Sequence, residues 1–263
     1  MKQYILYIIP LLAVSLLIAC TAEENGLPTN MRGSFTLGLS TDSLAVEVTT
    51  RAGRDLTDAE GHIFTVSLTQ NGETIWENIP FADITEADCI QPVGDGYVVS
   101  AESCTYAEAE SANDGWGQSR YYGQSVSFDI KSGENTEVTV DCHMANAGIC
   151  VEFDESFTSY FTMGYSVTTD DSRTLRFDGT TSGRVAYYNI SEGNTRVVHL
   201  LVNASAGWDG TLHIERDLVL TRGRVTRLHV RKGEPNEGQV DLGITFDDEF
   251  DVQYEFVDVP IED

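Results

Sequence analysis

Hydrophobic and polar positions alternate with a period of two along most of the chain after residue 31. Such alternation places every second side chain on the same face of a β-strand. After the first 20 residues, no run with the 3.6-residue period of a helix extends beyond about three turns. The pattern therefore predicts an all-β protein.

The alternation is clearest between residues 121 and 157, where it is interrupted at residues 143–148 by small and polar side chains. Such a break between alternating runs predicts a seam between two hydrophobic cores. Two predicted strands precede the seam and one follows it, marked in turn by Val126, Phe128 and Ile130, by Val138, Val140 and Cys142, and by Ile149, Val151 and Phe153. One β domain is thus expected to end here and a second to begin.

Turn signals divide the rest of the chain into short strands. Asn71-Gly72 lies between two alternating runs, which is a strong signal for a hairpin. Residues from Thr105 to Arg120 are predicted to form a polar loop that holds Trp116. Together the strands predict two tandem antiparallel β-sandwiches, at residues 32–144 and 145–233, followed by a linker and an acidic C-terminal strand segment at residues 234–263. In the second sandwich the strands are marked by Tyr165 and Val167, Leu175 and Phe177, Val185 and Tyr187, Val198 to Val202, Leu212 and Ile214, Leu218 and Leu220, and Leu228 and Val230.

Composition and charge narrow the functional classes. The 263 residues are 41% hydrophobic, which is typical of globular domains, and the length is sufficient for two of them. The formal net charge of −26 repels phosphate backbones. Since nucleic-acid binding depends mainly on basic contacts to phosphate, we expect no nucleic-acid partner.

The first 20 residues have the order of an export leader. Lys2 precedes an apolar stretch from Ile5 to Ile18, and Leu17-Ile18-Ala19-Cys20 closes it. A plain secretory signal would need an A-x-A site, and a membrane helix a longer apolar run with charged flanks. The four residues resemble the bacterial lipobox, which implies that residues 1–19 are a signal peptide and that Cys20 becomes lipidated. Residues 20–31 then form a flexible tether.

Several motifs of the first domain carry a family resemblance: the strand entry Gly96-Tyr97, Tyr121 to Gly123, the turn Ser132 to Thr136, and Val140 to Asn146. In this order they resemble the fimbrillin-like cell-adhesion surface lipoproteins of the Bacteroidetes, a family of unknown function. The resemblance covers nearly the whole mature chain. It implies Greek-key sandwiches of immunoglobulin-like or transthyretin-like topology and supplies no catalytic motif. The acidic pair Glu23-Glu24 resembles the signal that exports such lipoproteins to the outer leaflet, which implies an outer-membrane, surface-exposed location.

The C-terminal segment repeats the beginning of the first domain. Gly33, Leu37, Gly38, Leu39 and Asp42 are matched by Gly238, Leu242, Gly243, Ile244 and Asp247. One interpretation is that both segments are edge strands of a repeated architecture. The other comes from fimbrillins, in which cleavage after an arginine releases the first strand and a neighbour's terminal strand replaces it. Under that resemblance, cleavage between Arg51 and Ala52 would let residues 238–257 replace residues 33–48 of another copy.

The cysteines beyond Cys20 raise the question of disulfides, since an exported chain favours pairing. Cys89 and Cys104 flank one turn-and-strand segment, so a bridge between them is a candidate. Cys142 shares a strand face with Val138 and Val140, which favours a buried thiol. A bridge between Cys142 and Cys150 would depend on the geometry of the seam.

No pattern of catalytic or metal-binding residues is present in the sequence. The five histidines have no metal-ligand spacing, and there is neither a G-x-S-x-G elbow nor a glycine-rich phosphate loop. The acidic loops contain no D-x-D-x-D-G run of a calcium site. We therefore expect no enzymatic activity, no cofactor and no metal.

Three further features bear on partners and on modification. Six basic residues gather between Arg216 and Lys232, which suits either a solvated strand pair or an acidic partner such as the C-terminus of another copy. Trp116 and Trp208 lie in polar loops, as sugar-stacking platforms or as hydrophobic plugs. Asp42-Ser43-Leu44 resembles the O-glycosylation sequon of Bacteroidetes, which implies modification of Ser43. The family resemblance implies adhesion or a fimbrial accessory or assembly role, and a glycan-binding lipoprotein of a nutrient-uptake system is the alternative.

Overall fold

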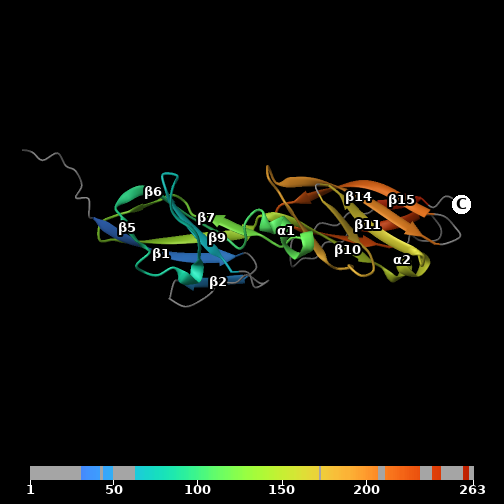
Figure 1. The fold of residues 1–263 in the computed structure, drawn as a ribbon, viewed down its shortest axis with the longest axis horizontal. Helices are drawn as coiled ribbons and strands as arrows, with labels where there is room; N and C mark the ends of the chain where they lie inside the picture. The colour runs from blue at the N-terminus through green and yellow to red at the C-terminus, as the bar shows by residue number, and fades with distance from the viewer. Residues whose placement is uncertain are drawn as a thin grey trace, which may run out of the picture.

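The computed structural model describes residues 31–41, 44–49, 63–171, 173–206, 211–231, 239–243 and 257–260. Strands dominate these residues, and the two α-helices among them are short. Two β bodies follow one another along the long axis of the molecule (Figure 1). Each body has its own cluster of buried hydrophobic side chains. The predicted all-β class with two tandem sandwiches is confirmed.

The first domain is built on one bent sheet. Its strand order is β2-β1-β9-β7-β6-β3-β4, with β5 paired to β1 and β8 paired to β6. The sheet folds over on itself, because Phe35 of β1 and Trp76 of β4 stack with ring centroids 5.7 Å apart although several strands separate them in the sheet. The elements are β1 (Arg32–Thr41), β2 (Leu44–Thr49), β3 (Thr65–Gln70), β4 (Glu73–Pro80), the 3-10 helix η1 (Phe81–Asp83), β5 (Ile90–Pro92), β6 (Gly94–Glu102), α1 (Glu108–Gly115), β7 (Tyr121–Gln124), β8 (Phe128–Ile130) and β9 (Asn135–Met144).

The second domain packs two sheets face to face. One has the order β13-β10-β16-β17-β18 and the other β12-β11-β14-β15. Buried side chains from both sheets form a single core between them. The elements are β10 (Asn146–Phe153), α2 (Glu155–Tyr160), β11 (Gly164–Asp170), β12 (Thr174–Phe177), β13 (Val185–Asn189), β14 (Thr195–Ser205), β15 (Thr211–Thr221), β16 (Val225–Val230), β17 (Gln239–Gly243) and β18 (Val257–Pro260).

Both domains contain a parallel strand pair that the sequence pattern did not predict. The remaining ladders are antiparallel, but β1 pairs with β9 in parallel and β10 pairs with β16 in parallel. In each case the first strand of a domain lies beside a strand from that domain's C-terminal end. A parallel pair needs a long crossover, which here is supplied by the intervening strands of the same domain.

Local turn chemistry decides the hairpin between β3 and β4. Asn71 and Gly72 have φ values of 50° and 85°. Two successive positive φ values are those of a type I′ turn, whose twist matches that of the paired strands. Gln70 pairs with Glu73 across the turn, so the predicted hairpin is confirmed.

Three local predictions need correction. Val126 does not share a buried face with Ile130: it is 86% exposed and precedes β8. The presumed loop between Thr105 and Arg120 contains α1. In β13 the buried side chains are Ala186 and Tyr188 instead of their neighbours at 185 and 187, because the strand presents the opposite face to the core.

Candidate functional site at the first strand and the domain junction

Strand β1 supplies a row of side chains to the first core. Phe35, Leu37 and Leu39 are 2%, 0% and 1% exposed, as their alternation with polar residues dictates. On the opposite face the Ser34 hydroxyl donates a hydrogen bond of 3.0 Å to Asn135 Oδ1, and that of Ser40 donates to Asp141. The strand is therefore fixed by apolar contacts on one face and by polar contacts to β9 on the other.

The backbone of β1 is held on both sides. Eight residues, from Ser34 to Thr41, pair in parallel with β9, and β2 pairs on the opposite edge. At its beginning the strand passes very close to the turn after β8. A Cβ atom placed on Gly33 would lie 2.1 Å from the carbonyl oxygen of Lys131 and 2.9 Å from Ile130 Cγ2. Any strand in this position therefore requires glycine there.

The C-terminal strands of the same chain extend the second domain. Strand β17 pairs with β16 through His229 with Gly243 and Val230 with Leu242. Strand β18 then pairs with β17. The segment that echoes β1 thus joins the second domain's sheet within its own chain.

Several predicted site residues fall outside the described part of the chain. These are the lipidation site Cys20, the glycosylation candidate Ser43, the cleavage pair Arg51 and Ala52, and Trp208.

The predicted bridge between Cys89 and Cys104 is not formed, and both residues are buried free thiols. Their separation follows from the length of β9. The carbonyl of Cys89 accepts from the amide of Phe35, which pairs with Thr136 near the start of β9. Cys104 lies near the other end, where its Sγ is 3.7 Å from the Ser119 carbonyl oxygen. The Ser103 amide donates to the carbonyl of Tyr121, which pairs with Met144 at the end of β9. From Thr136 to Met144 the strand rises by eight residues. At about 3.3 Å per residue this is about 26 Å, which is too far for a disulfide.

The other cysteines are buried as well. Cys142 lies in the first core, which confirms the expected buried thiol. Cys150 is a free thiol of β10, and its Sγ lies 3.8 Å from Arg227 Nη1. Burial raises the pKa of the Cys89 and Cys150 thiols to about 11, so both stay protonated and unreactive at neutral pH.

Of the two alternatives for Trp116, the structure shows the hydrophobic plug, which packs in the core of the second domain. It is 8% exposed and belongs to the second core although it precedes the last strands of the first domain. Its ring meets Phe177 edge-on with centroids 4.9 Å apart, and the Arg184 guanidinium lies 4.2 Å from its centroid. A side chain packed in this way is not available to stack on a sugar.

Local sequence explains how Trp116 reaches the second core. Thr105 and Glu108 form a capping box, in which each side chain accepts from the other's backbone N–H at 3.2 and 2.9 Å. After one helical turn Asn113 and Asp114 take positive φ values, which reverse the chain. Gly117 follows with φ +78°, and a Cβ there would lie 2.4 Å from the Ala109 carbonyl oxygen. The turn thus aims the indole out of the first domain.

Polar contacts surround this plug and join the domains. The amide of Tyr187 donates 2.8 Å to the Trp116 carbonyl, and the amide of Asn189 donates 2.7 Å to Glu110 Oε1. Arg196 pairs with Glu110 and, at 2.6 Å, with Asp171. Arg173 also donates to the carbonyls of Glu110, at 2.7 Å, and of Gly115. Sequence reasoning missed this junction, whose signals were the Thr-x-x-Glu capping box and the Gly-Trp-Gly triplet.

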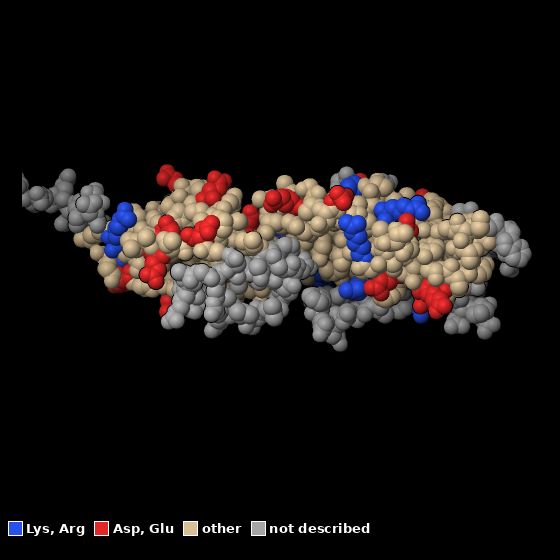
Figure 2. All heavy atoms as spheres, turned by 60° about the horizontal axis from the view of Figure 1, so that its bottom comes forward, with Lys and Arg blue, Asp and Glu red and all other residues tan. Residues whose placement is uncertain are grey.

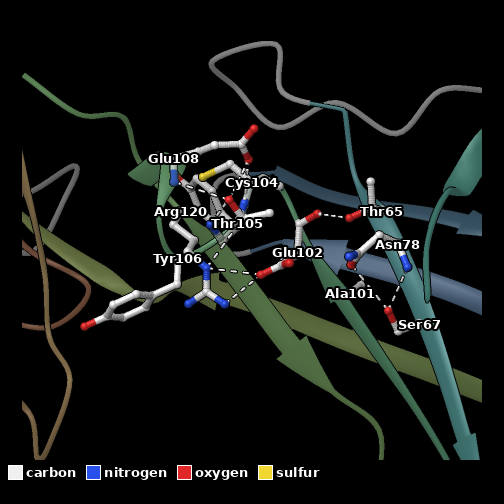
Figure 3. A network of polar contacts seen from close by, with 12 residues as sticks. Thr65, Ser67, Asn78, Ala101, Glu102, Cys104, Thr105, Tyr106, Glu108 and Arg120 are labelled. Atoms are coloured by element: carbon white, nitrogen blue, oxygen red, sulfur yellow. Dashed lines mark hydrogen bonds and ion pairs between the residues drawn. The ribbon is translucent and has the colours of Figure 1, made fainter. Parts of the chain in front are cut away.

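A second polar network lies beside the junction (Figure 3). Arg120 donates to Glu102 Oε2 at 2.7 and 3.2 Å and to the Cys104 carbonyl at 3.2 Å. Its guanidinium carbon lies 5.8 Å from the ring centroid of Tyr106 and 5.0 Å from that of Tyr122. The arginine is therefore fixed between two tyrosines on the surface of the first domain.

The basic residues of the second domain are partly engaged within it. Arg227 pairs with Glu152 at 2.7 Å, and Arg222 donates to the carbonyls of Ile190 and Gly193. On the face in Figure 2, Lys and Arg gather over the second domain and at the outer end of the first. Acidic side chains are spread over both domains on this face.

Three of the described histidines, His199, His213 and His229, lie beside carboxylates on strand surfaces. His199 Nδ1 is 2.8 Å from Asp217, and His213 Nε2 is 3.1 Å from Glu215. Within the described ranges, no group of three or more His, Cys, Asp or Glu residues is arranged to hold a metal ion. In the same part of the chain, no helix has the length and apolar character to span a membrane.

Comparisons with known proteins give a family and a set of similar structures. No curated protein matches the sequence significantly. A fimbrial assembly protein from Parabacteroides distasonis is 12% identical, with a TM-score of 0.45, and the match covers 88% of this chain and 100% of that one. The fimbrial anchor protein Mfa2 from Porphyromonas gingivalis is 13% identical, with a TM-score of 0.36 and coverage of 81% and 97%. A family model matches residues 32–261, so the chain belongs to the family described as "Domain of unknown function (DUF4493)".

Proposed function

We propose that this protein is a non-catalytic, lipid-anchored lipoprotein of the outer-membrane surface that acts in adhesion or as a fimbrial accessory or assembly subunit. Its lipid would be attached at Cys20. Its partner would be another fimbrial subunit or another copy of itself. In that contact, cleavage after Arg51 would free residues 33–48, and residues 238–257 of the partner would take their place. This is β-strand addition, in which main-chain hydrogen bonds give affinity and alternate side-chain pockets give specificity.

The observation that carries the proposal is the need for glycine at position 33. In the match between the two segments, the residue that would enter this tight place is Gly238. The same match brings Val240, Leu242 and Ile244 to the three buried positions of β1. All three are β-branched or aliphatic residues that suit a strand facing a core. The donor segment therefore meets the steric and the hydrophobic requirements together.

Departure of β1 would expose apolar surface of the first core. Each fully buried apolar side chain contributes roughly 1.5 to 3 kcal/mol. Loss of Phe35, Leu37 and Leu39 would remove three such contributions and expose the edge of β9. A cleaved first domain would thus be unstable until a donor strand refilled it.

Repulsion between like charges opposes the exchange of the donor strand, because both the first domain and the donor segment are acidic. Residues 32–144 contain 19 acidic and 5 basic side chains, and residues 238–257 contain 6 acidic and no basic ones. Salt screens such repulsion over about 10 Å at 0.1 M. Donor binding should therefore strengthen as salt is raised, in contrast to an interface held by ion pairs.

The test replaces Arg51-Ala52 with the recognition sequence of a specific protease in the lipid-free mature protein. After cleavage, a fluorescent peptide of residues 238–257 is added and binding is followed by anisotropy and size-exclusion chromatography. We expect displacement of the N-terminal fragment and a stable complex. A matched peptide carrying Gly238→Val should bind at least about tenfold more weakly, because its Cβ meets the Lys131 carbonyl. A cleaved protein that stays monomeric and binds neither peptide would disprove strand exchange.

Protein taken from the native cell surface gives an independent test. A new N-terminus at Ala52 in high-mass assemblies is the expected result for strand exchange. A lipidated, uncleaved monomer would leave only the anchored adhesion role.

A further inference from the structure

An open groove of about 460 Å³ lies on the outer face of the first domain, between β7 and β9. The two strands pair only at Tyr121 with Met144 and Tyr122 with His143. Strand β7 stays paired with β6 from Tyr122 to Gln124, and the Ser125 amide continues this pairing by donating 2.8 Å to the Val99 carbonyl. The groove forms where the two strands part.

One wall of the groove is an aromatic ring that is fixed in advance. Tyr122 is 38% exposed and lines the groove. The Arg120 guanidinium lies 5.0 Å from its centroid and is itself fixed by Glu102 and the Cys104 carbonyl. A ring held by such a cation–π contact loses little conformational freedom when a ligand stacks on it.

The remaining lining provides short polar groups. Gln124 offers an amide, Thr139 a hydroxyl and His143 an imidazole, all on exposed positions. The exposed Asp141 carboxylate accepts from the Ser40 hydroxyl and has further acceptor capacity. Together these groups donate and accept hydrogen bonds over a small area. A flat apolar ring beside a set of donors and acceptors matches a sugar ring, which has an apolar C–H face and a rim of hydroxyls. The volume lies within the ~300–1,000 Å³ of small-ligand sites.

Charge restricts the ligand further. The net charge of residues 32–144 is −14, and Arg120 is already paired with Glu102. Sulfated, sialylated and phosphorylated ligands are therefore repelled. We infer that the groove binds a neutral carbohydrate, as one or two residues of a longer glycan that continues past the open ends. The inference deepens the adhesion part of the proposed function, on which it rests, by giving it a ligand class; it is independent of strand exchange.

The experiment uses the intact lipid-free mature chain and an array of neutral oligosaccharides printed together with their sialylated and sulfated forms. The best binder is then titrated by isothermal calorimetry. We expect binding to neutral glycans only, and Tyr122→Ala should weaken it at least about tenfold. Tyr106→Ala is the matched control, since Tyr106 also contacts Arg120 and is exposed but does not line the groove. Its affinity should stay within about twofold of the unsubstituted protein.

Thr139→Trp provides a second variant that fills the groove from an exposed strand position and leaves the Tyr122 ring in place. It should abolish binding without lowering the melting temperature. Absence of binding to any neutral glycan, preference for the anionic forms, or equal losses in Tyr122→Ala and Tyr106→Ala would overturn the inference. None of these outcomes affects capture of the 238–257 peptide by the cleaved protein, so failure here and failure of strand exchange are distinguishable.

Discussion

The two domains place their first strands differently, although each pairs its first strand in parallel with a later strand of the same domain. Strand β1 buries alternate residues, and the edge opposite β9 is covered by β2. Strand β10 has six consecutive buried residues, lies between β13 and β16, and is separated from β9 by one residue. Removing β1 would open one edge of one core, whereas removing β10 would disrupt the second core and the junction. A releasable strand is therefore compatible with the first domain only.

The domains also differ in charge. Residues 32–144 carry a net −14, whereas residues 145–233 contain 10 acidic and 10 basic side chains and are neutral. The C-terminal segment 234–263 carries 11 acidic and no basic side chains. Electrostatics therefore favours this segment on the neutral second domain, where β17 pairs with β16. The proposed exchange into the first domain would instead depend on shape and apolar burial.

The largest expected effect comes from Trp116→Ala. Removal of a buried aromatic side chain costs about 3–5 kcal/mol. Because Trp116 packs in the second core, we expect this loss in the unfolding of the second domain. Urea denaturation measures the loss of stability, and amide hydrogen exchange in β14 and in β3 reports the second and the first domain separately. Tyr106→Ala, which removes an exposed aromatic side chain, is the control. If only the amides of β3 lost protection from exchange, Trp116 would stabilise the first domain and not the second.

Leu37→Ala tests the difference between the first strands directly. It should lower the free energy of unfolding by about 2–5 kcal/mol and increase capture of the 238–257 peptide by the cleaved protein. Ile149→Ala in β10 is the matched control, with a similarly buried side chain. It should destabilise the protein without increasing capture. Equal capture by both variants would contradict a specific release of β1.

Glu110→Gln should weaken the junction by about 1.5–3 kcal/mol, since its carboxylate accepts from Arg196 and from the Asn189 amide. A double-mutant cycle that combines Glu110→Gln with Arg196→Gln measures the coupling energy between the two side chains. Glu108→Gln is the control, because that carboxylate serves only the local capping box with Thr105 among its described contacts. A coupling energy near zero would mean that the Glu110–Arg196 pair does not stabilise the junction, which would then depend on Trp116 and on the Arg173 contacts to the Glu110 and Gly115 carbonyls.

The smallest effect is expected for Asp154→Ala at the start of α2, at about 0.5–2 kcal/mol near neutral pH. Asp154 Oδ1 accepts 2.8 Å from the Ser156 amide, and the hydrogen bonds to Ser156 lower the pKa of this carboxyl below 3.8. Its contribution is fully present above the ordinary value and is lost as pH falls through the lower folded value. Stability curves of the two proteins should therefore converge in acid. Glu155→Ala is the control near neutral pH and should cost less, since the cap hydrogen bond of α2 is accepted by Asp154.

Sequence alone determined the features that depend on neighbouring residues. Period-two alternation marked Leu37 and Val140 as buried, and Asn71-Gly72 set the hairpin, because strand geometry and positive φ are local properties. The match of Gly33 with Gly238 was also visible, but not the Lys131 carbonyl that makes glycine necessary.

Only the tertiary structure decided which distant residues meet. The parallel pairing of β1 with β9, the distance between Cys89 and Cys104, and the face that β13 presents to the core depend on how the sheets fold over. Trp116 reaches the second core, and Glu110 meets Arg196 across 86 positions of sequence. Alternation along one strand predicts which face of the strand each side chain lies on. It does not determine which residue packs or bonds there, because burial and hydrogen bonding join residues that are close in space and distant in sequence.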